Sequence, residues 1–349
     1  MPGKRQHRRK PRSEPFWASY RDEELLDLRL CDLGLKIEDT PLVPRIKQLN
    51  AELEARGLRL RPRCWLSGEW FSPHDAPGIA IPFYLAHARL RKLEGKQMKE
   101  VEGGTRNWCM QLLRHEAGHC YETAYQLTRR KRWRRLFGRP SKPYPDFYNP
   151  KPVSRQFVLH LDWWYGQSHP VEDFAETFAV WLRPGSPWRK RYKDWPAIEK
   201  LEYVDEVMQE LAGKPPLVKL RAEAEPVRLL RQTLREYYRE KQERYGKSYP
   251  DFYDHDLGRL FPEPVNRRTY PPASTFLRRI SPELRRRVSA WTGEYAYPIN
   301  RVLRDMIQRS HELGLRVTRP AGELKLEAAI LLTMQTMNYL LSRNHHIAV

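Results

Sequence analysis

The chain has 349 residues, and 63 lysines and arginines against 43 aspartates and glutamates give it a formal net charge of +20. This length is typical of about two domains, and the positive charge favours acidic partners without specifying a fold. No apolar run approaches the roughly 18 residues that a membrane span needs. The four cysteines form no CxxC pattern. Composition therefore excludes a membrane protein, a disulfide-rich secreted module and a wholly disordered chain.

Residues 1–20 are basic and poor in aliphatic side chains, which predicts a disordered tail. No apolar segment follows the basic residues, so they are not a secretory signal, and reduced cysteines then favour a cytoplasmic protein. Residues 22–57 carry a helical apolar pattern that ends at Gly57. Short apolar runs in residues 58–90 predict strands, and Pro82 places its strand at the edge of a sheet.

A long helix is predicted to begin after Thr105, because this residue follows two glycines and suits the N-cap position. A basic, proline-rich connector covers residues 129–155. Residues 156–165 are apolar and aromatic, which predicts another strand. A second helix is predicted to begin near His169 and Pro170, because proline suits the first helical position.

The remaining chain is mainly helical by its apolar pattern. The predicted helices cover residues 197–211, 227–245, 282–291, 299–313 and 323–342. We therefore predict three regions. They are a basic disordered tail at residues 1–20, a folded domain at residues 21–189, and a mainly helical C-terminal region of unknown role at residues 190–349.

Residues 115–119 read His-Glu-Ala-Gly-His, which is an HExxH pattern. Positions i and i+4 share one face of a helix, so His115 and His119 can bind one cation. Glu116 lies beside them and can take a proton from metal-bound water. Catalytic zinc uses three protein ligands and one open position, so a third ligand is needed. The alternative interpretation is a pair of half-exposed histidines that bind no metal.

A second motif supplies the missing ligand. Residues 168–178 place Glu172 and Glu176 four positions apart, on one face of the second predicted helix. One carboxylate can bind the metal, and the other can accept the free ring N–H of a ligand histidine and fix its tautomer. Glu122 and Tyr125 stand where metzincins need a glycine and a third ligand, which excludes that class.

Together the motifs resemble the gluzincin metallopeptidases, and more narrowly a bacterial family described as "putative zinc-binding metallopeptidases". The catalytic domain of anthrax lethal factor is a more distant resemblance. The similarity covers roughly residues 58–183. It implies a single Zn²⁺ per chain with His115, His119 and Glu172 as ligands, and Glu116 as general base. It also implies that Glu176 does not bind the metal itself but hydrogen-bonds to one of the metal ligands.

The lethal-factor type places Tyr-Gly seven residues before the ligand glutamate, and Tyr165 and Gly166 match that position. The resemblance therefore implies that the Tyr165 hydroxyl stabilises the oxyanion or protonates the leaving amine. It also implies an α+β, zincin-like core. We expect a small mixed sheet, the HExxH helix and the glutamate-bearing helix, followed by the mainly helical C-terminal region.

Two further positions are weaker candidates. Asp162 follows a strand-like segment and could orient a metal ligand, although such an aspartate more often caps a turn. The apolar run around Ile79 and Ile81 precedes the HExxH helix, and an extended substrate could add to its edge by backbone hydrogen bonds. An ordinary core strand is the equal alternative.

These residues predict a soluble, cytoplasmic zinc metallopeptidase that hydrolyses peptide or amide bonds, and the basic surface favours an acidic peptide or protein substrate. The basic runs at residues 4–12 and 129–135 support an alternative, a nucleic-acid or acidic-surface binding protein with a degenerate peptidase domain. The nucleic-acid alternative is not favoured, because no RRM, KH or zinc-finger signature is present. A third class is a structural zinc protein, but such closed sites usually use cysteine ligands.

Overall fold

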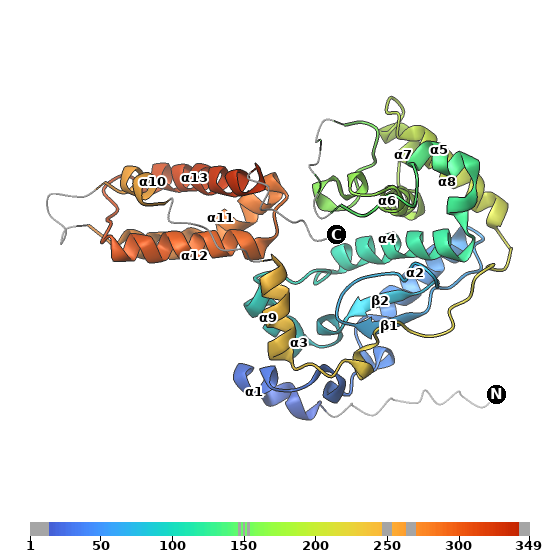
Figure 1. The fold of residues 1–349 in the computed structure, drawn as a ribbon, viewed down its shortest axis with the longest axis horizontal. Helices are drawn as coiled ribbons and strands as arrows, with labels where there is room; N and C mark the ends of the chain where they lie inside the picture. Colours follow the sequence, from blue (N-terminus) through green and yellow to red (C-terminus); the bar gives the residue numbers. More distant parts are fainter. Residues whose placement is uncertain are drawn as a thin grey trace, which may run out of the picture.

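The computed structural model describes residues 14–145, 148, 151, 154–245, 253–262 and 270–341. This part of the chain is mainly helical, with one small sheet (Figure 1). Its longer elements are α1 (Asp22–Leu26), α2 (Val43–Ala55), β1 (Cys64–Ser67), β2 (Ile79–Pro82), α3 (Ala88–Met98), α4 (Arg106–Ala124), α5 (Lys131–Phe137), α6 (Pro170–Leu182), α7 (Trp188–Arg191), α8 (Ile198–Leu211), α9 (Leu234–Tyr245), α10 (Tyr253–Leu260), α11 (Ala273–Thr292), α12 (Ala296–Glu312) and α13 (Ala321–Leu341). Short 3-10 helices lie at Phe16–Ser19, Leu30–Leu33, Ile37–Asp39, Phe83–Ala86, Leu127–Arg129, Asp162–Gln167 and Val227–Leu229.

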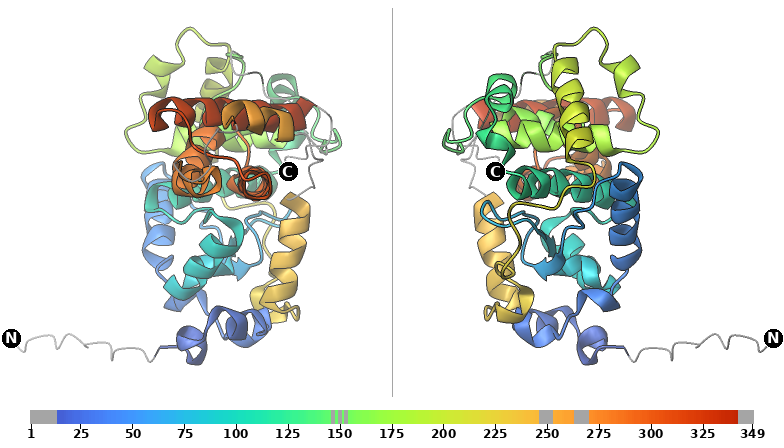
Figure 2. Two further views of the ribbon diagram at one scale, coloured as in Figure 1. Left: turned by 90° about the vertical axis from the view of Figure 1, so that its left-hand side faces the viewer. Right: turned by 90° about the vertical axis from the view of Figure 1, so that its right-hand side faces the viewer.

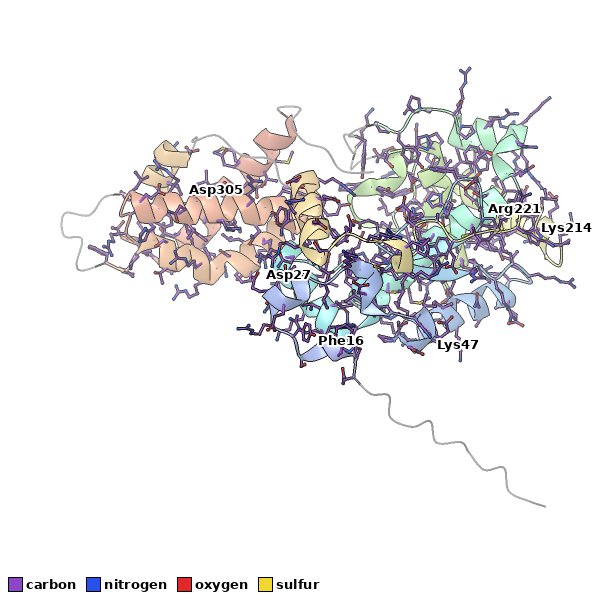
Figure 3. The ribbon with its side chains drawn as sticks, turned by 60° about the horizontal axis from the view of Figure 1, so that its bottom comes forward. Phe16, Asp27, Lys47, Lys214, Arg221 and Asp305 are labelled. Atoms are coloured by element: carbon purple, nitrogen blue, oxygen red, sulfur yellow. The ribbon has the colours of Figure 1, made fainter. Side chains whose placement is uncertain are left out.

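Buried apolar side chains form two separate cores. The first core runs from Trp17 to Tyr238, and the second from Leu257 to Leu332. Helices α10–α13 build the second core and lie as a bundle beside the rest of the molecule (Figures 1 and 2). The side-chain view shows the same division, with Asp305 on the bundle and Lys47 on the first core (Figure 3). The predicted boundary at residue 190 does not coincide with this division, because α8 and α9 pack into the first core.

The folded part of the chain begins closer to the N-terminus than the composition of residues 1–20 predicts. Residues 1–13 lie outside the described part of the chain, but residues 14–20 are folded. Trp17 is fully buried, and its indole N–H donates to the Leu33 carbonyl at 3.0 Å. The predicted disordered tail is therefore wrong for residues 14–20, because one large buried aromatic side chain anchors this segment.

The predicted mixed sheet is reduced to β1 and β2, which pair in parallel from Cys64–Ile79 to Ser67–Pro82. Its antiparallel part is a single bridge between Phe71 and Ala80, whose backbone groups exchange hydrogen bonds of 2.9 and 3.5 Å. Ile79 and Ile81 are fully buried. The free edge of β2 is thus already occupied at its centre by Phe71, and both isoleucine side chains belong to the first core. Their predicted contact with substrate, which would use backbone groups, stays a prediction.

The two helices that carry the motifs form as predicted. The Thr105 hydroxyl accepts the Trp108 N–H at 3.2 Å and begins α4, while His169 caps α6 and Pro170 is its first residue. The helices cross at Gly118, where a Cβ atom would lie 2.8 Å from the Ala175 Cα. The glycine of the HEAGH motif therefore allows α4 and α6 to approach closely enough for their polar side chains to meet.

Two segments between these helices differ from the prediction. The connector contains α5, whose Trp133 and Phe137 lie one turn apart and are buried. The strand predicted at residues 156–165 is wrong, because no strand forms there and a 3-10 helix covers Asp162–Gln167. Side chains, rather than a neighbouring strand, provide hydrogen-bond partners for backbone groups of this segment. The Leu161 N–H, for example, donates to Glu176 Oε2 at 2.9 Å.

The C-terminal helices differ from the predicted ranges in three places. The helix predicted at residues 227–245 begins only at Leu234, with a separate 3-10 helix at Val227–Leu229, and α10 was not predicted. We predicted a helix beginning at Pro282, but α11 begins at Ala273 and contains Pro282 in its interior. Ser281 donates from its hydroxyl to the Leu277 carbonyl at 2.6 Å beside this proline. None of the helices in the described ranges is both long and apolar enough to cross a bilayer.

Candidate metal centre

Three nitrogen and oxygen atoms from α4 and α6 converge on one point. His115 Nε2 and His119 Nε2 lie 3.1 Å apart, and Glu172 Oε2 lies 3.0 and 3.1 Å from them respectively. A tetrahedral zinc ion with bonds of about 2.0–2.1 Å holds its ligand atoms roughly 3.3 Å apart. The three atoms therefore form a triangle of the right size for one zinc ion.

Glu176 fixes the orientation of the first imidazole. His115 Nδ1 lies 2.9 Å from Glu176 Oε1, while the other oxygen of this carboxylate accepts the Leu161 N–H. A carboxylate can only accept hydrogen bonds, so the proton of the neutral ring is at Nδ1. Nε2 then has a free lone pair directed toward the other two ligand atoms, which is the tautomer that metal binding requires.

The charges of the cluster also fit a cation. Burial by itself would lower the pKa of His115, but hydrogen bonds with Glu172 and Glu176 outweigh it and raise that pKa well above its usual value. Burial raises the pKa of Glu172, yet the two imidazoles hold it well below its usual value. Two buried carboxylates thus require positive charge between the rings, and a divalent cation supplies it directly.

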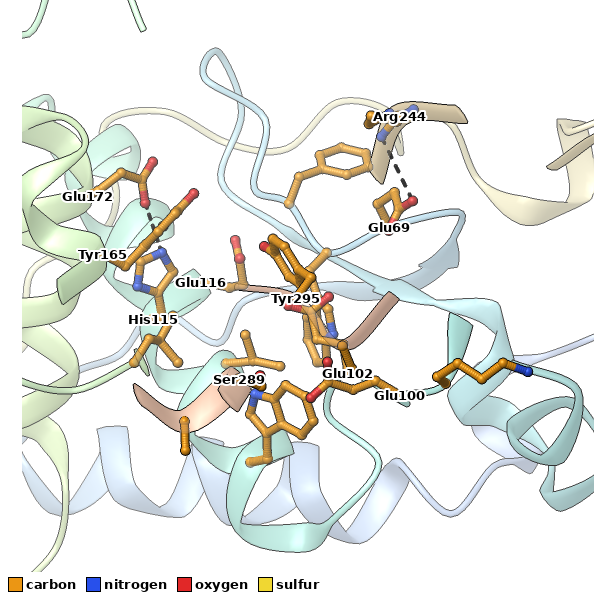
Figure 4. A pocket seen from close by; sticks show the side chains of 18 of the residues that line it. Glu69, Glu100, Glu102, His115, Glu116, Tyr165, Glu172, Arg244, Ser289 and Tyr295 are labelled. Atoms are coloured by element: carbon orange, nitrogen blue, oxygen red, sulfur yellow. Dashed lines mark hydrogen bonds and ion pairs between the residues drawn. The ribbon is translucent and has the colours of Figure 1, made fainter. Parts of the chain in front are cut away.

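Glu116 lies next to this triangle, where it interacts with Ser72 and with both imidazoles. It is buried, with 6% of its surface exposed, and its Oε2 atom has no hydrogen-bond partner among the described residues. Figure 4 shows its carboxylate in the cavity between His115 and Tyr295. Burial raises the pKa of Glu116, while the neighbouring imidazoles oppose that shift. Its free oxygen is therefore placed to accept a proton from a group in the cavity.

Tyr165 lines the same cavity, with its ring centroid 5.6 Å from that of His115 (Figure 4). The residue before it, Trp164, has a φ of +54°, a left-handed conformation that large side chains rarely adopt. Burial and the Glu172 charge raise the pKa of Tyr165 well above its usual value, so the phenol keeps its proton. Asp162 begins the 3-10 helix, but its side chain lies outside the described part, and its predicted role stays a prediction.

The sequence motifs missed Tyr144. Its hydroxyl donates to Glu172 Oε1 at 2.8 Å, which leaves only Oε2 facing the two histidines. Its ring stacks on His169 with a centroid distance of 3.9 Å and an interplanar angle of 15°. His169 Nε2 in turn lies 2.6 Å from the Lys142 carbonyl, while Nδ1 accepts the Val171 N–H. Its one signal in the sequence is the run Tyr-Pro-Asp-Phe-Tyr at residues 144–148, which matches no metal-site motif.

The triangle opens into a cavity of about 740 Å³, within the range of roughly 300–1,000 Å³ that is common for ligand sites. One wall comes from the first core and the opposite wall from α11 and the start of α12. The metal ligands lie at one end, and Glu69, Glu100 and Arg244 at the other (Figure 4). The second core therefore contributes directly to the space above the metal centre.

Residues 74–184 match a family model described as "Putative zinc-binding metallo-peptidase". The match covers less than half of the chain and includes all of α4 and α6, with the three ligand candidates and Glu116. No curated protein and no solved structure matches the chain. The metallopeptidase match and the three-residue metal group thus agree on the same part of the molecule, and the match does not extend to the second core.

Proposed function

We propose that this protein is a zinc-dependent peptidase of the gluzincin type, which hydrolyses peptide bonds with Glu116 as general base. The observation that carries the proposal is the set of three ligand atoms 3.0–3.1 Å apart, open to a cavity that Glu116 shares. A structural zinc site would be closed and rich in cysteine. Here the ligands are two histidines and one glutamate, and one side remains open to the cavity.

Zinc bound by His115, His119 and Glu172 would supply a Lewis acid that makes water nucleophilic near neutral pH and polarises a carbonyl group. The protein residues divide the remaining work. Glu116 Oε2 accepts the proton of the attacking water and returns it to the departing amine nitrogen. The Tyr165 hydroxyl donates a hydrogen bond to the oxygen on which negative charge develops. Glu176 keeps the His115 ring in its required tautomer throughout.

The nucleic-acid alternative has less support than its basic sequence suggests. Most of the basic run at residues 129–135 lies in α5, with Arg130 as its N-cap, and two of the arginines form ion pairs with α8. Arg130 pairs with Glu210 at 2.6 Å, and Arg132 pairs with Glu206. These contacts remove cations that would otherwise meet phosphate groups. Cytoplasmic location remains a proposal, and the free thiols of Cys31, Cys64, Cys109 and Cys120 support it.

The test compares the wild type with Glu172→Ala and Glu116→Gln for zinc content and for cleavage of a mixed peptide library. We expect about one zinc per chain in the wild type and in Glu116→Gln, and much less in Glu172→Ala. Of these three proteins, only the wild type should cleave peptides. Glu122→Gln is the matched control, because Glu122 lies on α4 but does not line the cavity. Full zinc binding by Glu172→Ala, or cleavage by Glu116→Gln, would contradict the proposal.

A further inference from the structure

The end of the cavity remote from the metal ligands is strongly charged. Figure 4 places Glu100 there, and Lys99 is its neighbour in the chain. Helix α11 contributes Arg285 and Arg286 to the same lining. Arg285 lies close enough to Glu100 and Lys99 to interact electrostatically with both. Cations from both cores thus meet at this end of the cavity.

The nearby carboxylates are largely neutralised by other groups. Glu69 lies 3.4 Å from the buried Lys241 ammonium group and 3.9 Å from the Arg244 guanidinium. Burial raises the pKa of Glu102 to about 7, so this side chain carries only part of a negative charge at neutral pH. Glu100 is the third carboxylate, and it interacts electrostatically with Arg285.

The cations, in contrast, have neutral hydrogen-bond acceptors or no close partner. Lys99 donates to the Lys96 carbonyl, and Arg285 donates to the Asn300 amide oxygen at 2.9 Å. Within the described ranges, no salt bridge joins Lys99, Arg285 or the exposed Arg286 to a carboxylate. Burial and repulsion from Arg285 lower the pKa of Lys99, which is the expected result of crowding like charges.

We propose that Lys99, Arg285 and Arg286 form a subsite that binds a carboxylate group of the peptide substrate. The inference rests on the proposed function, because the metal centre in the same cavity defines the substrate as a peptide. Two of the three cations lie on α11, so the second core selects the substrate while the first core holds the metal ligands. The carboxylate belongs either to an acidic side chain or to the C-terminus of the peptide.

A peptide carboxylate suits this subsite better than a nucleic acid does. A guanidinium group binds a carboxylate through two parallel hydrogen bonds. A single carboxylate therefore suits a subsite that contains only three cations. A polyanion would have to place several further charges along a cavity that also contains Glu69, Glu100 and Glu102. Three cations in one cavity therefore suit a substrate with one or a few isolated negative charges better than a polyanion.

The experiment uses the full, zinc-loaded chain and a fluorescein-labelled hexapeptide with a single glutamate. Its counterpart has glutamine at that position, and each peptide is made with a free and with an amidated C-terminus. The variants are the single substitution Arg286→Gln and a double variant that carries both Arg285→Gln and Arg286→Gln. Arg287→Gln is the matched control, because Arg287 pairs with Glu283 at 2.9 Å and does not line the cavity. Binding is measured by fluorescence anisotropy in the Glu116→Gln background, and cleavage in the wild-type background.

We expect the glutamate or free-carboxylate peptide to bind about three- to tenfold more tightly than its neutral counterpart, with the difference in KM rather than kcat. The preference should disappear in the double variant, shrink in Arg286→Gln and persist in Arg287→Gln. The peptide form that carries the preference identifies which carboxylate is bound. Equal binding of charged and neutral peptides, or a preference that survives the double variant, overturns the subsite.

Two additional outcomes separate this inference from the proposed function. If Arg-dependent binding is observed but no peptide is cleaved, the subsite stands and the proposed hydrolysis fails. If a single-stranded oligonucleotide displaces the acidic peptide at lower concentration than the unlabelled peptide does, the assignment to a peptide carboxylate is overturned. Folding of each variant is checked by circular dichroism. Arg286→Gln should disturb folding least, because the Arg286 side chain is exposed to solvent.

Discussion

The two cores of this protein use polar groups in different ways. The first core buries ion pairs between distant elements, such as Arg114–Glu52, Lys200–Asp173 and Lys241–Glu94. The described part of the second core contains mainly Leu, Ile, Val, Met and Phe, and its ion pairs, such as Arg319–Glu327, are at least partly exposed. Buried ion pairs contribute little net stability, but removal of one partner leaves a buried charge uncompensated. The core that holds the metal ligands is therefore the one in which the loss of a single ion-pair partner costs most.

Removing one partner of a buried pair should have the largest effect. Arg114 contacts both oxygens of Glu52 at 2.7 and 2.8 Å, and both residues are buried. Glu52→Gln leaves a buried charge without its partner, so we expect a loss of about 3–5 kcal/mol of unfolding free energy. The corresponding change in the second core, Glu327→Gln, should cost less than about 1 kcal/mol. Urea denaturation checks both values, and equal losses would contradict the contrast between the cores.

The close contact of α4 and α6 gives the next largest effect. In Gly118→Ala the new Cβ atom would lie 2.8 Å from the Ala175 Cα, which is backbone and cannot rotate away. We expect a loss of about 2–3 kcal/mol and weaker zinc binding, because the helices must separate. Gly322→Ala in α13 is the control: its Cβ atom meets nothing within 4 Å, and alanine favours helix formation. Thermal melting with and without zinc distinguishes them, and an unchanged melting temperature for Gly118→Ala would refute the contact.

The Tyr144 hydrogen bond should affect metal binding more than folding. Tyr144→Phe removes the donor to Glu172 Oε1, so the carboxylate is free to turn away from the histidines. Loss of such a supporting hydrogen bond lowers metal affinity about ten- to hundredfold. Competition with a chromophoric chelator measures the change, and the visible spectrum of the Co²⁺ form reports any change of coordination. Tyr20→Phe, at a residue outside the cavity, should change neither.

A smaller effect concerns pH. Burial raises the pKa of Glu102 to about 7, above the value of about 4.3 that a glutamate has in an unfolded chain. The folded state therefore holds this proton more tightly, and its contribution to stability is present below about pH 4 and is lost as the pH rises through about 7. Glu102→Gln should reduce the decline of unfolding free energy over that interval. The exposed Glu243→Gln should leave the decline unchanged, and an identical decline in both variants would contradict the raised pKa.

The sequence predicted the elements whose signals are local. Thr105, His169 and Pro170 mark helix starts by their own chemistry, and the i, i+4 spacing of His115 and His119 needs only one helix. The second helix and its Glu172 could also be predicted, because the motif that contains Glu172 and Glu176 lies within one short stretch of the sequence. What brings Glu172 to the histidines is the crossing at Gly118, and this close packing has no signature beyond the glycine itself.

The remaining features depend on contacts that no local pattern reveals. Residues 156–165 have strand-like composition, but their partners are the side chains of Glu176 and Tyr192 rather than another strand. Tyr144 donates to Glu172 from a loop, and its ring stacks on His169, a contact between residues 25 positions apart in the chain. Helix α11, which forms one wall of the cavity, is far from the metal-site motifs in the amino-acid sequence. Its apolar pattern predicts a helix but does not predict which of its polar residues line the cavity.

Glu176 has a consequence that extends beyond its own helix. One of its oxygens contacts a metal-ligand imidazole, and the other accepts the Leu161 amide proton from the segment that leads to Tyr165. A single side chain thus joins the centre to one backbone amide outside α4 and α6. In a nuclear magnetic resonance spectrum, the chemical shift and solvent exchange of that amide would respond when the carboxylate changes its partner or its charge. Leu161 therefore carries a natural probe of the centre that requires no label at the centre itself.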